Sequence, residues 1–303
     1  MSLKNKYLIT VVGPTAVGKT ALSVVLAKRY STCVLSADSR QIYKELSIGT
    51  AKPGIEEQDG VKHYFIDTLS ITEPFNAGMF ERQALDLLET LFLQHDVVVA
   101  CGGTGLYIKA LLEGMDALPE TDEELRAALK IEFERKGMDR MLEELREVDP
   151  AAVEQMDTHN PSRVFRALEV YRQTGIPISA FHTGQKAERL FKTVQIGLNM
   201  ERNALYERIN RRMDLMLDAG LEDEARSNIA FRHANALHTV GYSEIFGFID
   251  GLYDREDMIR LLKRNSRRYA KRQLTWFGRD PKIRWFHPEQ VEEIVGYIEK
   301  ELV

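Results

Sequence analysis

The chain of 303 residues is 44% hydrophobic and 29% charged, the composition of a globular protein with room for more than one domain or lobe. Its formal net charge of −5 excludes a uniformly basic nucleic-acid binder, so such a role requires a local basic patch. Two cysteines exclude a disulfide framework, and no apolar run approaches the roughly 18 residues of a membrane helix. Because the N-terminus also lacks a signal-peptide pattern, we expect a cytoplasmic protein with no membrane partner.

The first chemical motif is a glycine-rich loop between a predicted strand at residues 7–12 and a predicted helix at residues 21–29. The loop has the G-x-x-x-x-G-K-T pattern of a phosphate-binding loop and consists of Gly13, Pro14, Thr15, Ala16, Val17, Gly18, Lys19 and Thr20. In this pattern backbone N–H groups surround phosphate oxygens, Lys19 reaches a terminal phosphate, and the Thr20 hydroxyl helps to hold Mg²⁺. The alternative is a glycine turn without a ligand, which the flanking strand and helix disfavour.

Two more strand-like runs, at residues 33–36 and 96–101, alternate with helical patterns at 80–94 and 105–112. This alternation predicts an α/β fold, a P-loop NTPase-like parallel sheet flanked by helices. Ligands of such sheets bind outside the carboxyl ends of the strands. Three polar loops should meet there: residues 13–20, 37–41 and 102–105.

A change of pattern near residue 115 predicts a second domain. Residues 115–185 are acidic and helical in pattern, and strand signals return only at residues 193–198 and 282–286. We therefore expect a helical insertion domain at residues 115–189. Residues 1–114 plus 190–303 should form the P-loop core domain with its C-terminal helices.

The loop after the second strand offers a candidate carboxylate. Asp38 at the end of a strand, facing the phosphate loop, can ligate a metal or act as a general base; the alternative is that it caps the next helix. Asp96 precedes its strand instead of ending it, so the strand-end acid of hydrolytic P-loop enzymes is missing, which favours group transfer over ATP hydrolysis. Thr104 can donate a hydrogen bond to a phosphate or cap the helix that follows, or do both.

Two groups of basic residues lie in predicted helices near the C-terminus. One helix face carries Arg260, Lys263, Arg264, Arg267, Arg268, Lys271 and Arg272. This basic face indicates contact with a nucleic-acid backbone; a membrane-surface helix and a solvated helix are the alternatives. On an earlier helix Arg208, Arg211 and Arg212 can neutralise a leaving pyrophosphate or touch RNA phosphates, or else pair with Glu201 and Glu207.

Taken together, these segments resemble the tRNA dimethylallyltransferase (tRNA isopentenyltransferase) family in its bacterial type. The blocks that carry the resemblance occur in order along the chain: residues 13–20, 36–43, 48–53, 102–107, 163–169, 208–220, 241–244 and 271–277. The most specific are Ser-Ala-Asp-Ser-Arg-Gln-Ile-Tyr at 36–43 and Lys-Arg-Gln-Leu-Thr-Trp-Phe at 271–277. The printed sequence shows no counterpart of the zinc finger of the longer eukaryotic members, so we expect the bacterial type.

The resemblance implies transfer of a dimethylallyl group from dimethylallyl diphosphate to N6 of adenosine 37, in tRNAs that read codons beginning with U. Diphosphate is then the leaving group, and the resemblance makes Asp38 the general base. Lys19, Thr20 with Mg²⁺, Thr104 and either Arg212 or Arg208 would stabilise the diphosphate, and Arg212 is slightly favoured.

The implied partners are the tRNA anticodon stem-loop and dimethylallyl diphosphate, and we expect a monomer that needs no protein partner. The target base must leave the anticodon loop to reach the site. The expected tRNA contacts are Asp38, Ser39, Arg40, Gln41, Thr104, Arg163, Arg166, Lys263, Arg264, Arg267, Arg268, Lys271 and Arg272. Two other functions remain open: prenylation of free adenine nucleotides, and a P-loop switch or RNA-binding module without transfer activity.

Overall fold

The computed structural model describes residues 6–302. The chain divides into two compact units: one joins the residues up to Glu113 with those from Glu188 onward, and the other is Gly114–Ala187. The predicted insertion, 115–189, begins one residue later and ends two residues later than the second unit.

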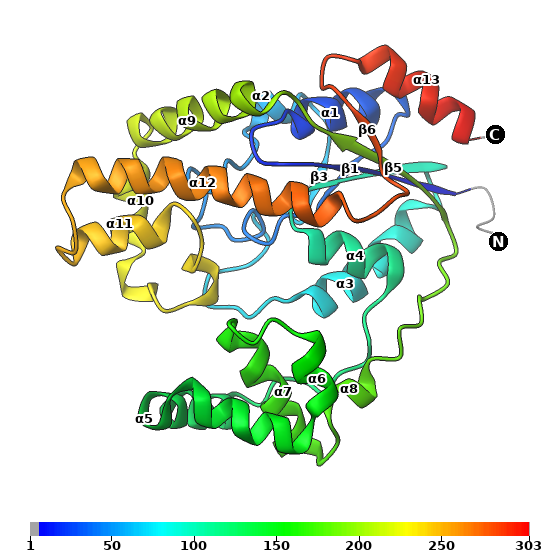
Figure 1. Cartoon of the computed structure of the whole chain (residues 1–303). Helices are drawn as coiled ribbons and strands as arrows, with labels where there is room; N and C mark the ends of the chain where they lie inside the picture. The colour runs from blue at the N-terminus through cyan, green and yellow to red at the C-terminus, as the bar shows by residue number, and fades with distance from the viewer. Residues whose placement is uncertain (1–5, 303) are drawn as a thin grey trace. The chain divides into compact units, whose positions relative to one another are not determined.

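A parallel sheet forms the centre of the first unit (Figure 1). Within residues 6–302 its order is β3-β2-β4-β1-β5-β6, and every neighbouring pair is parallel. The strands are β1 (Tyr7–Val12), β2 (Val34–Ser36), β3 (His63–Tyr64), β4 (Val97–Gly102), β5 (Lys192–Leu198) and β6 (Arg284–Phe286). The predicted P-loop-type α/β fold is thereby confirmed, although the two-residue strand β3 was too short to leave a pattern in the sequence.

Strand β1 lies in the middle of the sheet and is buried along its whole length. Ile9 and Val11 belong to one hydrophobic cluster, with residues of α1 (Lys19–Arg29) and α13 (Val291–Glu301). Leu8 and Val12 belong to the other cluster, with residues of α3 (Ala77–Leu91) and α4 (Gly105–Glu113). Helices therefore cover both faces of the sheet (Figure 1), which explains why β1 is uniformly apolar.

The helices after β5 complete the first unit. They are α9 (Arg202–Asp218), α10 (Leu221–Ser227), α11 (Tyr242–Ile249) and α12 (Arg255–Phe277), and a short α2 (Ile55–Gln58) precedes β3. Asp254 begins α12 by accepting a hydrogen bond from the Asp257 N–H, and the helix buries Met258, Leu262 and Ser266. Because this side of α12 packs into the protein, the membrane-surface alternative for its basic face is wrong.

The second unit contains only helices among its described elements: α5 (Glu123–Val148), α6 (Pro150–Gln155), α7 (Pro161–Thr174) and α8 (Ile178–Phe181). It has a hydrophobic core of its own, which includes Leu145 and Leu168. Glu169 is fully buried there and is neutralised by Arg126 at 3.0 Å and Arg166 at 2.7 Å. The helical character of the predicted insertion is confirmed.

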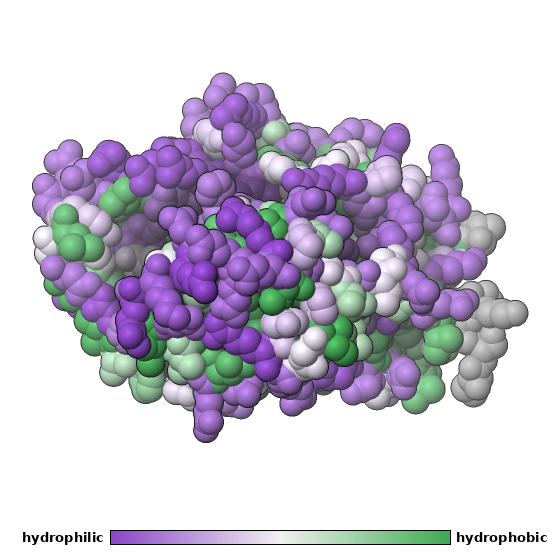
Figure 2. Space-filling model, turned by 60° about the horizontal axis from the view of Figure 1, so that its bottom comes forward, coloured by the Kyte–Doolittle hydropathy of each residue, from purple (hydrophilic) through white to green (hydrophobic). Residues whose placement is uncertain are grey.

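The molecular surface is mostly hydrophilic on the face shown in Figure 2, where hydrophobic side chains form small separate groups. Exposed large apolar residues such as Ile55, Leu93 and Leu252 come from different parts of the chain. Within residues 6–302, no helix combines the length and the hydrophobicity needed to cross a bilayer.

Candidate active site

The phosphate loop connects β1 to α1 in a backbone conformation that needs its glycines. Gly13 and Gly18 have φ angles of 144° and 109°, and a Cβ on Gly13 would lie 2.5 Å from the Leu198 carbonyl oxygen. The Lys19 ammonium donates to the carbonyl oxygens of Gly13 at 3.1 Å and Pro14 at 2.8 Å, so it lies within the curve of the loop. Burial, reinforced by the charge of a nearby arginine, lowers the pKa of Lys19 to about 8. An anion bound in this loop would favour the protonated lysine.

Asp38 follows β2 and organises a turn. One of its carboxylate oxygens accepts hydrogen bonds from the N–H groups of Arg40 at 2.9 Å and Gln41 at 3.3 Å. No helix begins there, so the helix-cap alternative is wrong. Within residues 6–302 the second carboxylate oxygen has no hydrogen-bond partner, and Asp38 lines the cavity in front of the phosphate loop. A free carboxylate oxygen in that position can accept a proton from a bound group.

Thr104 joins the glycine-rich loop after β4 to the Asp38 turn. Its hydroxyl accepts a hydrogen bond from the Ser39 N–H at 3.0 Å and lies 3.3 Å from the Ser39 hydroxyl oxygen. Its carbonyl, not its hydroxyl, begins α4. Gly102 permits this close approach, since a Cβ there would lie 2.2 Å from the Ala37 carbonyl oxygen. A contact between Thr104 and a phosphate stays a prediction.

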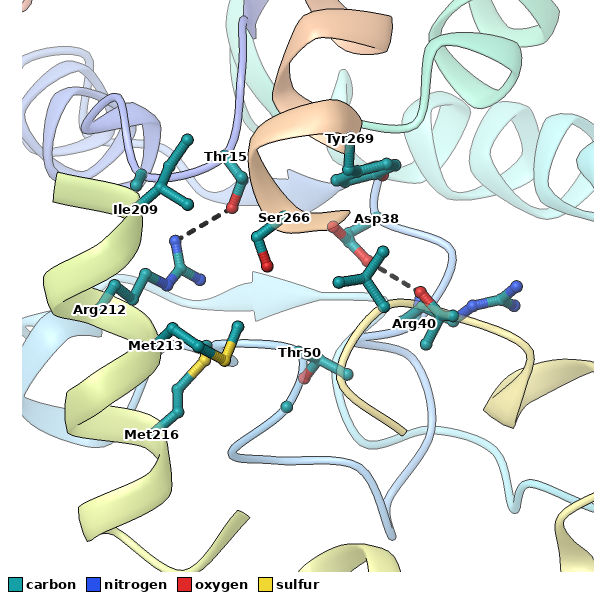
Figure 3. A pocket seen from close by; sticks show the side chains of 14 residues that line it. Thr15, Asp38, Arg40, Thr50, Ile209, Arg212, Met213, Met216, Ser266 and Tyr269 are labelled. Atoms are coloured by element: carbon teal, nitrogen blue, oxygen red, sulfur yellow. Dashed lines mark hydrogen bonds between the residues drawn. The ribbon is translucent and has the colours of Figure 1, made fainter. Parts of the chain in front are cut away.

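Three arginines of α9 line the same cavity as Lys19 and Thr20, and the cavity has a volume of about 650 Å³. Arg212 donates to the Thr15 hydroxyl at 3.3 Å (Figure 3). Burial lowers the pKa of Arg212, and the negative charge of Asp38 opposes that effect. Within the described residues, Arg208, Arg211 and Arg212 form no ion pair with Glu201 or Glu207, so the alternative of intrahelical pairing is wrong. Lys19 and the three arginines of α9 thus line one cavity.

Two residues of α12 complete the cavity, and sequence reasoning assigned neither to the site. Gln273 accepts a hydrogen bond from the Thr15 N–H at 2.8 Å and donates to the Gly103 carbonyl at 3.0 Å, so it joins the phosphate loop to the loop after β4. Tyr269 lines the cavity beside Asp38, and burial, helped by the charge of Asp38, raises the pKa of its hydroxyl. The available signals were the polar side chains on the buried face of an otherwise basic helix and, for Gln273, its place in the family block at 271–277.

A smaller cavity of about 90 Å³ adjoins the larger one, and both are lined by Asp38, Thr50 and Tyr269. Figure 3 shows Met213 and Met216 extending into it from the same helix as Arg212. Its other apolar lining residues include Ile209 and Val240. The site therefore places an anion-binding loop, a carboxylate and a cavity with a partly apolar lining next to one another.

The expected tRNA contacts are only partly available at this site. Arg40 lines the smaller cavity, but the Gln41 amide already donates to the carbonyls of Thr50 and Ala51 and accepts from the Ser36 hydroxyl. The Gln41 side chain therefore holds the protein backbone, and its contact with a nucleotide stays a prediction.

In the second unit, the guanidinium of Arg166 is bound to Glu169 and to the Pro119 carbonyl, which gives it a structural role, while Arg163 is exposed. Contact of either arginine with tRNA stays a prediction.

The basic face of α12 is divided between paired and unpaired charges. Arg260 pairs with Asp257 at 2.7 Å, Lys263 pairs with Asp214 at 2.6 Å, and Arg267 donates to Asn210 at 2.6 Å. Within residues 6–302, the exposed Arg268 and Lys271 have no ion-pair partner. Arg264 and Arg267 bond only to the neutral side chains of Asn265 and Asn210 within the same residues, and Arg272 lies over the Tyr269 ring. The alternative of a helix with scattered partners thus applies to Arg260 and Lys263, and the free charge lies along the rest of the face.

The parallel sheet, the phosphate loop after its central strand and the cationic cavity at the strand ends define a P-loop protein. Two solved structures support this class: the full-length tRNA isopentenylpyrophosphate transferase of Bacillus halodurans and a eukaryotic dimethylallyltransferase acting on tRNA. The first has a TM-score of 0.73 with 38% identity over 98% of this chain and 97% of the other. The second has a TM-score of 0.73 with 26% identity over 90% of this chain and 70% of the other.

The model of the IPP transferase family matches residues 41–280, and the chain belongs to this family. The chain is 69% identical to the tRNA dimethylallyltransferase of Cytophaga hutchinsonii over 302 residues. The alignment covers 100% of this chain and 99% of that protein. It is 46% identical to tRNA dimethylallyltransferase 1 of Bacteroides fragilis, over 97% of this chain and 98% of that protein. The family resemblance seen in the sequence motifs is confirmed.

Proposed function

We propose that this protein transfers a dimethylallyl group from dimethylallyl diphosphate to N6 of adenosine 37 in tRNAs that read codons beginning with U, with release of diphosphate. The observation that carries the proposal is the position of Asp38, which lines the cavity of Lys19 and Arg212 and also the adjoining smaller cavity, where Met213, Met216 and Ile209 form part of the lining. Membership of the IPP transferase family supports the same reaction.

The reaction breaks the bond between the allylic carbon and the diphosphate oxygen and forms a bond from that carbon to N6. Negative charge builds on the diphosphate as it leaves, and Lys19, Arg212 and Arg208 lower the free energy of that charge. The adenine amine is a weak nucleophile that loses a proton as the new bond forms. Asp38, one oxygen of which has no partner among the described residues, accepts that proton.

The residues at the loop fit a magnesium ion. The Thr20 hydroxyl lines the cavity and offers an oxygen ligand, and Mg²⁺ in proteins usually keeps several waters and is bound through few protein groups together with substrate phosphates. Within the described residues no cluster of three or more His, Cys, Asp or Glu is arranged for a metal, so most ligands would come from diphosphate and water. When bound, the ion would neutralise charge on the leaving diphosphate.

The unpaired charges at the second half of α12 supply the contact for tRNA phosphates, and the flipped adenine enters toward Arg40 and Asp38. Family membership supports tRNA as the partner. We place the protein in the cytoplasm, acting as a monomer.

The test is incubation of the protein with dimethylallyl diphosphate, Mg²⁺ and unmodified tRNA, followed by mass spectrometry of the nucleosides. The proposal predicts isopentenyl adenosine at position 37, and its absence would refute the transfer reaction. A competition between AMP and tRNA in the same reaction separates tRNA modification from prenylation of free nucleotides, since only an RNA substrate uses Arg268 and Lys271. Rapid ATP hydrolysis without transfer would instead support a P-loop switch.

A further inference from the structure

The Glu224 carboxylate attaches one wall of the two cavities to α10. Gly49 and Thr50 line the smaller cavity, and Thr50 also lines the larger one. The Glu224 carboxylate accepts hydrogen bonds from three successive backbone N–H groups: Ser47 at 2.8 Å, Ile48 at 2.8 Å and Gly49 at 2.9 Å. Because all three donors belong to the backbone, these bonds fix the path of the loop.

The Glu224 carboxylate is also held by Tyr242. The hydroxyl of Tyr242, a fully buried residue, donates to Glu224 at 2.6 Å. The Tyr242 ring also packs against the loop, since a Cβ on Gly49 would lie 2.7 Å from it. At the end of α10, Asn228 donates to the Glu45 carbonyl at 3.4 Å, which adds a second tie to the same segment. The helix and the loop are thus joined at several points.

The other side of the loop is joined to the Asp38 turn. The Gln41 amide donates to the carbonyls of Thr50 at 3.3 Å and Ala51 at 3.2 Å, and the Gln41 N–H donates to the Asp38 carboxylate at 3.3 Å. Ala51 has a φ of 46°, a conformation that is unfavourable for a residue with a Cβ and that persists only where surrounding contacts impose it. A displacement of the loop would therefore reach Asp38 through Gln41.

We propose that Glu224 is a positioning residue for the transfer reaction. It touches neither substrate: its carboxylate fixes residues 47–49 and, through Thr50 and Gln41, the orientation of Asp38 toward the reacting amine. This inference rests on the proposed function and adds to it a residue of α10, outside the cavity lining.

The test variant is Glu224→Gln, which has a single acceptor oxygen and turns an NH₂ group toward backbone donors. Hydrogen exchange of the amides in residues 45–52 should become faster. The kcat should fall about 10- to 100-fold, because misplacement by an ångström at a reacting centre has that effect. The KM for dimethylallyl diphosphate should stay within about threefold, because the phosphate loop is unchanged. The control is Glu222→Gln on the same helix, whose carboxylate pairs with Arg255 at 2.8 Å and should affect neither measurement.

Faster exchange with a wild-type kcat, or unchanged exchange, would overturn the positioning role. If Glu224→Gln does not fold, Tyr242→Phe is the second test, because it removes only the hydroxyl that donates to the Glu224 carboxylate. Faster amide exchange together with a lower kcat would support the positioning role of Glu224. Wild-type exchange rates and a wild-type kcat would overturn it. If the wild-type protein makes no isopentenyl adenosine, the proposed function is refuted instead. The exchange measurement does not depend on that function, so the two failures can be distinguished.

Discussion

Replacing Asp38 with asparagine separates its chemical role from its structural role. The carboxylate oxygen that accepts the N–H groups of Arg40 and Gln41 has an equivalent in the asparagine carbonyl, so the turn is kept. The other oxygen has no partner within residues 6–302, so the new NH₂ group displaces no hydrogen bond. The fold should be unaffected, while loss of a general base lowers turnover by about 10²–10⁴-fold. That is about 3–5 kcal/mol of activation free energy.

The assay is single-turnover formation of isopentenyl adenosine at saturating dimethylallyl diphosphate, at pH 6.5 and pH 8.5. The two pH values matter because Asp38 also raises the pKa of Lys19, so the variant holds a more acidic lysine. If the loss acted through Lys19, activity would return at pH 6.5, where the lysine is protonated. The control is Asp96→Asn, an exposed carboxylate that pairs with Lys6 at the start of β4 and should leave turnover unchanged. Turnover within tenfold of wild type, or recovery at low pH, would contradict the base role.

Three further predictions concern the phosphate loop, its link to α12 and the basic face of α12. The pKa of Lys19 is lowered to about 8, so the lysine is cationic below that pH. The affinity for inorganic pyrophosphate, measured by calorimetry, should therefore fall as the pH rises through 8. Lys19→Met should abolish this part of the pH dependence. Gln273→Ala leaves the Thr15 N–H and the Gly103 carbonyl without partners and should lower the free energy of unfolding in urea by about 1–3 kcal/mol; a wild-type midpoint would count against this link. The double variant Arg268→Ala, Lys271→Ala should weaken tRNA binding and reduce its salt slope by about 1.5–2. Arg260→Ala, whose charge is already paired with Asp257, should change the slope far less, and equal effects would disprove the division of this face.

The parts of the site that are local in sequence were predictable from the residues alone. The run from β1 through Gly13 and Lys19 into α1 is continuous, so strand, turn and helix signals specify the phosphate loop without tertiary information. Asp38 could be placed beside it because parallel strands end at one edge of a sheet. These inferences depend on the period of the hydrophobic pattern and on the turn residues.

The contacts between distant segments could not be predicted in this way. Gln273 lies 258 positions from Thr15, and Glu224 lies 177 positions from Ser47, so no local pattern records either contact. Gln41 lines the larger cavity, and its expected contact with a nucleotide stays a prediction, but its amide also holds the backbone of Thr50, which no sequence pattern indicated. A polar side chain beside a site has the same sequence signature whether it binds a ligand or supports a loop, and only its partners distinguish the two.

The charge balance of the cavity explains how a phosphate loop can serve transfer without hydrolysis of a nucleotide. The residues that line the larger cavity carry five cationic groups, those of Lys19, Lys52 and the three arginines of α9, against two carboxylates, those of Asp38 and Glu57. Lys52 is paired with Asp67, outside this lining. An excess of cations favours a diphosphate that gains charge as its bond to carbon breaks. Since β4 ends in Cys101 and Gly102 instead of an acid, this strand supplies no carboxylate to hold a metal for attack by water on a phosphate. Asp38, which follows β2, lines both cavities, where a proton acceptor can serve the nucleophile that attacks carbon.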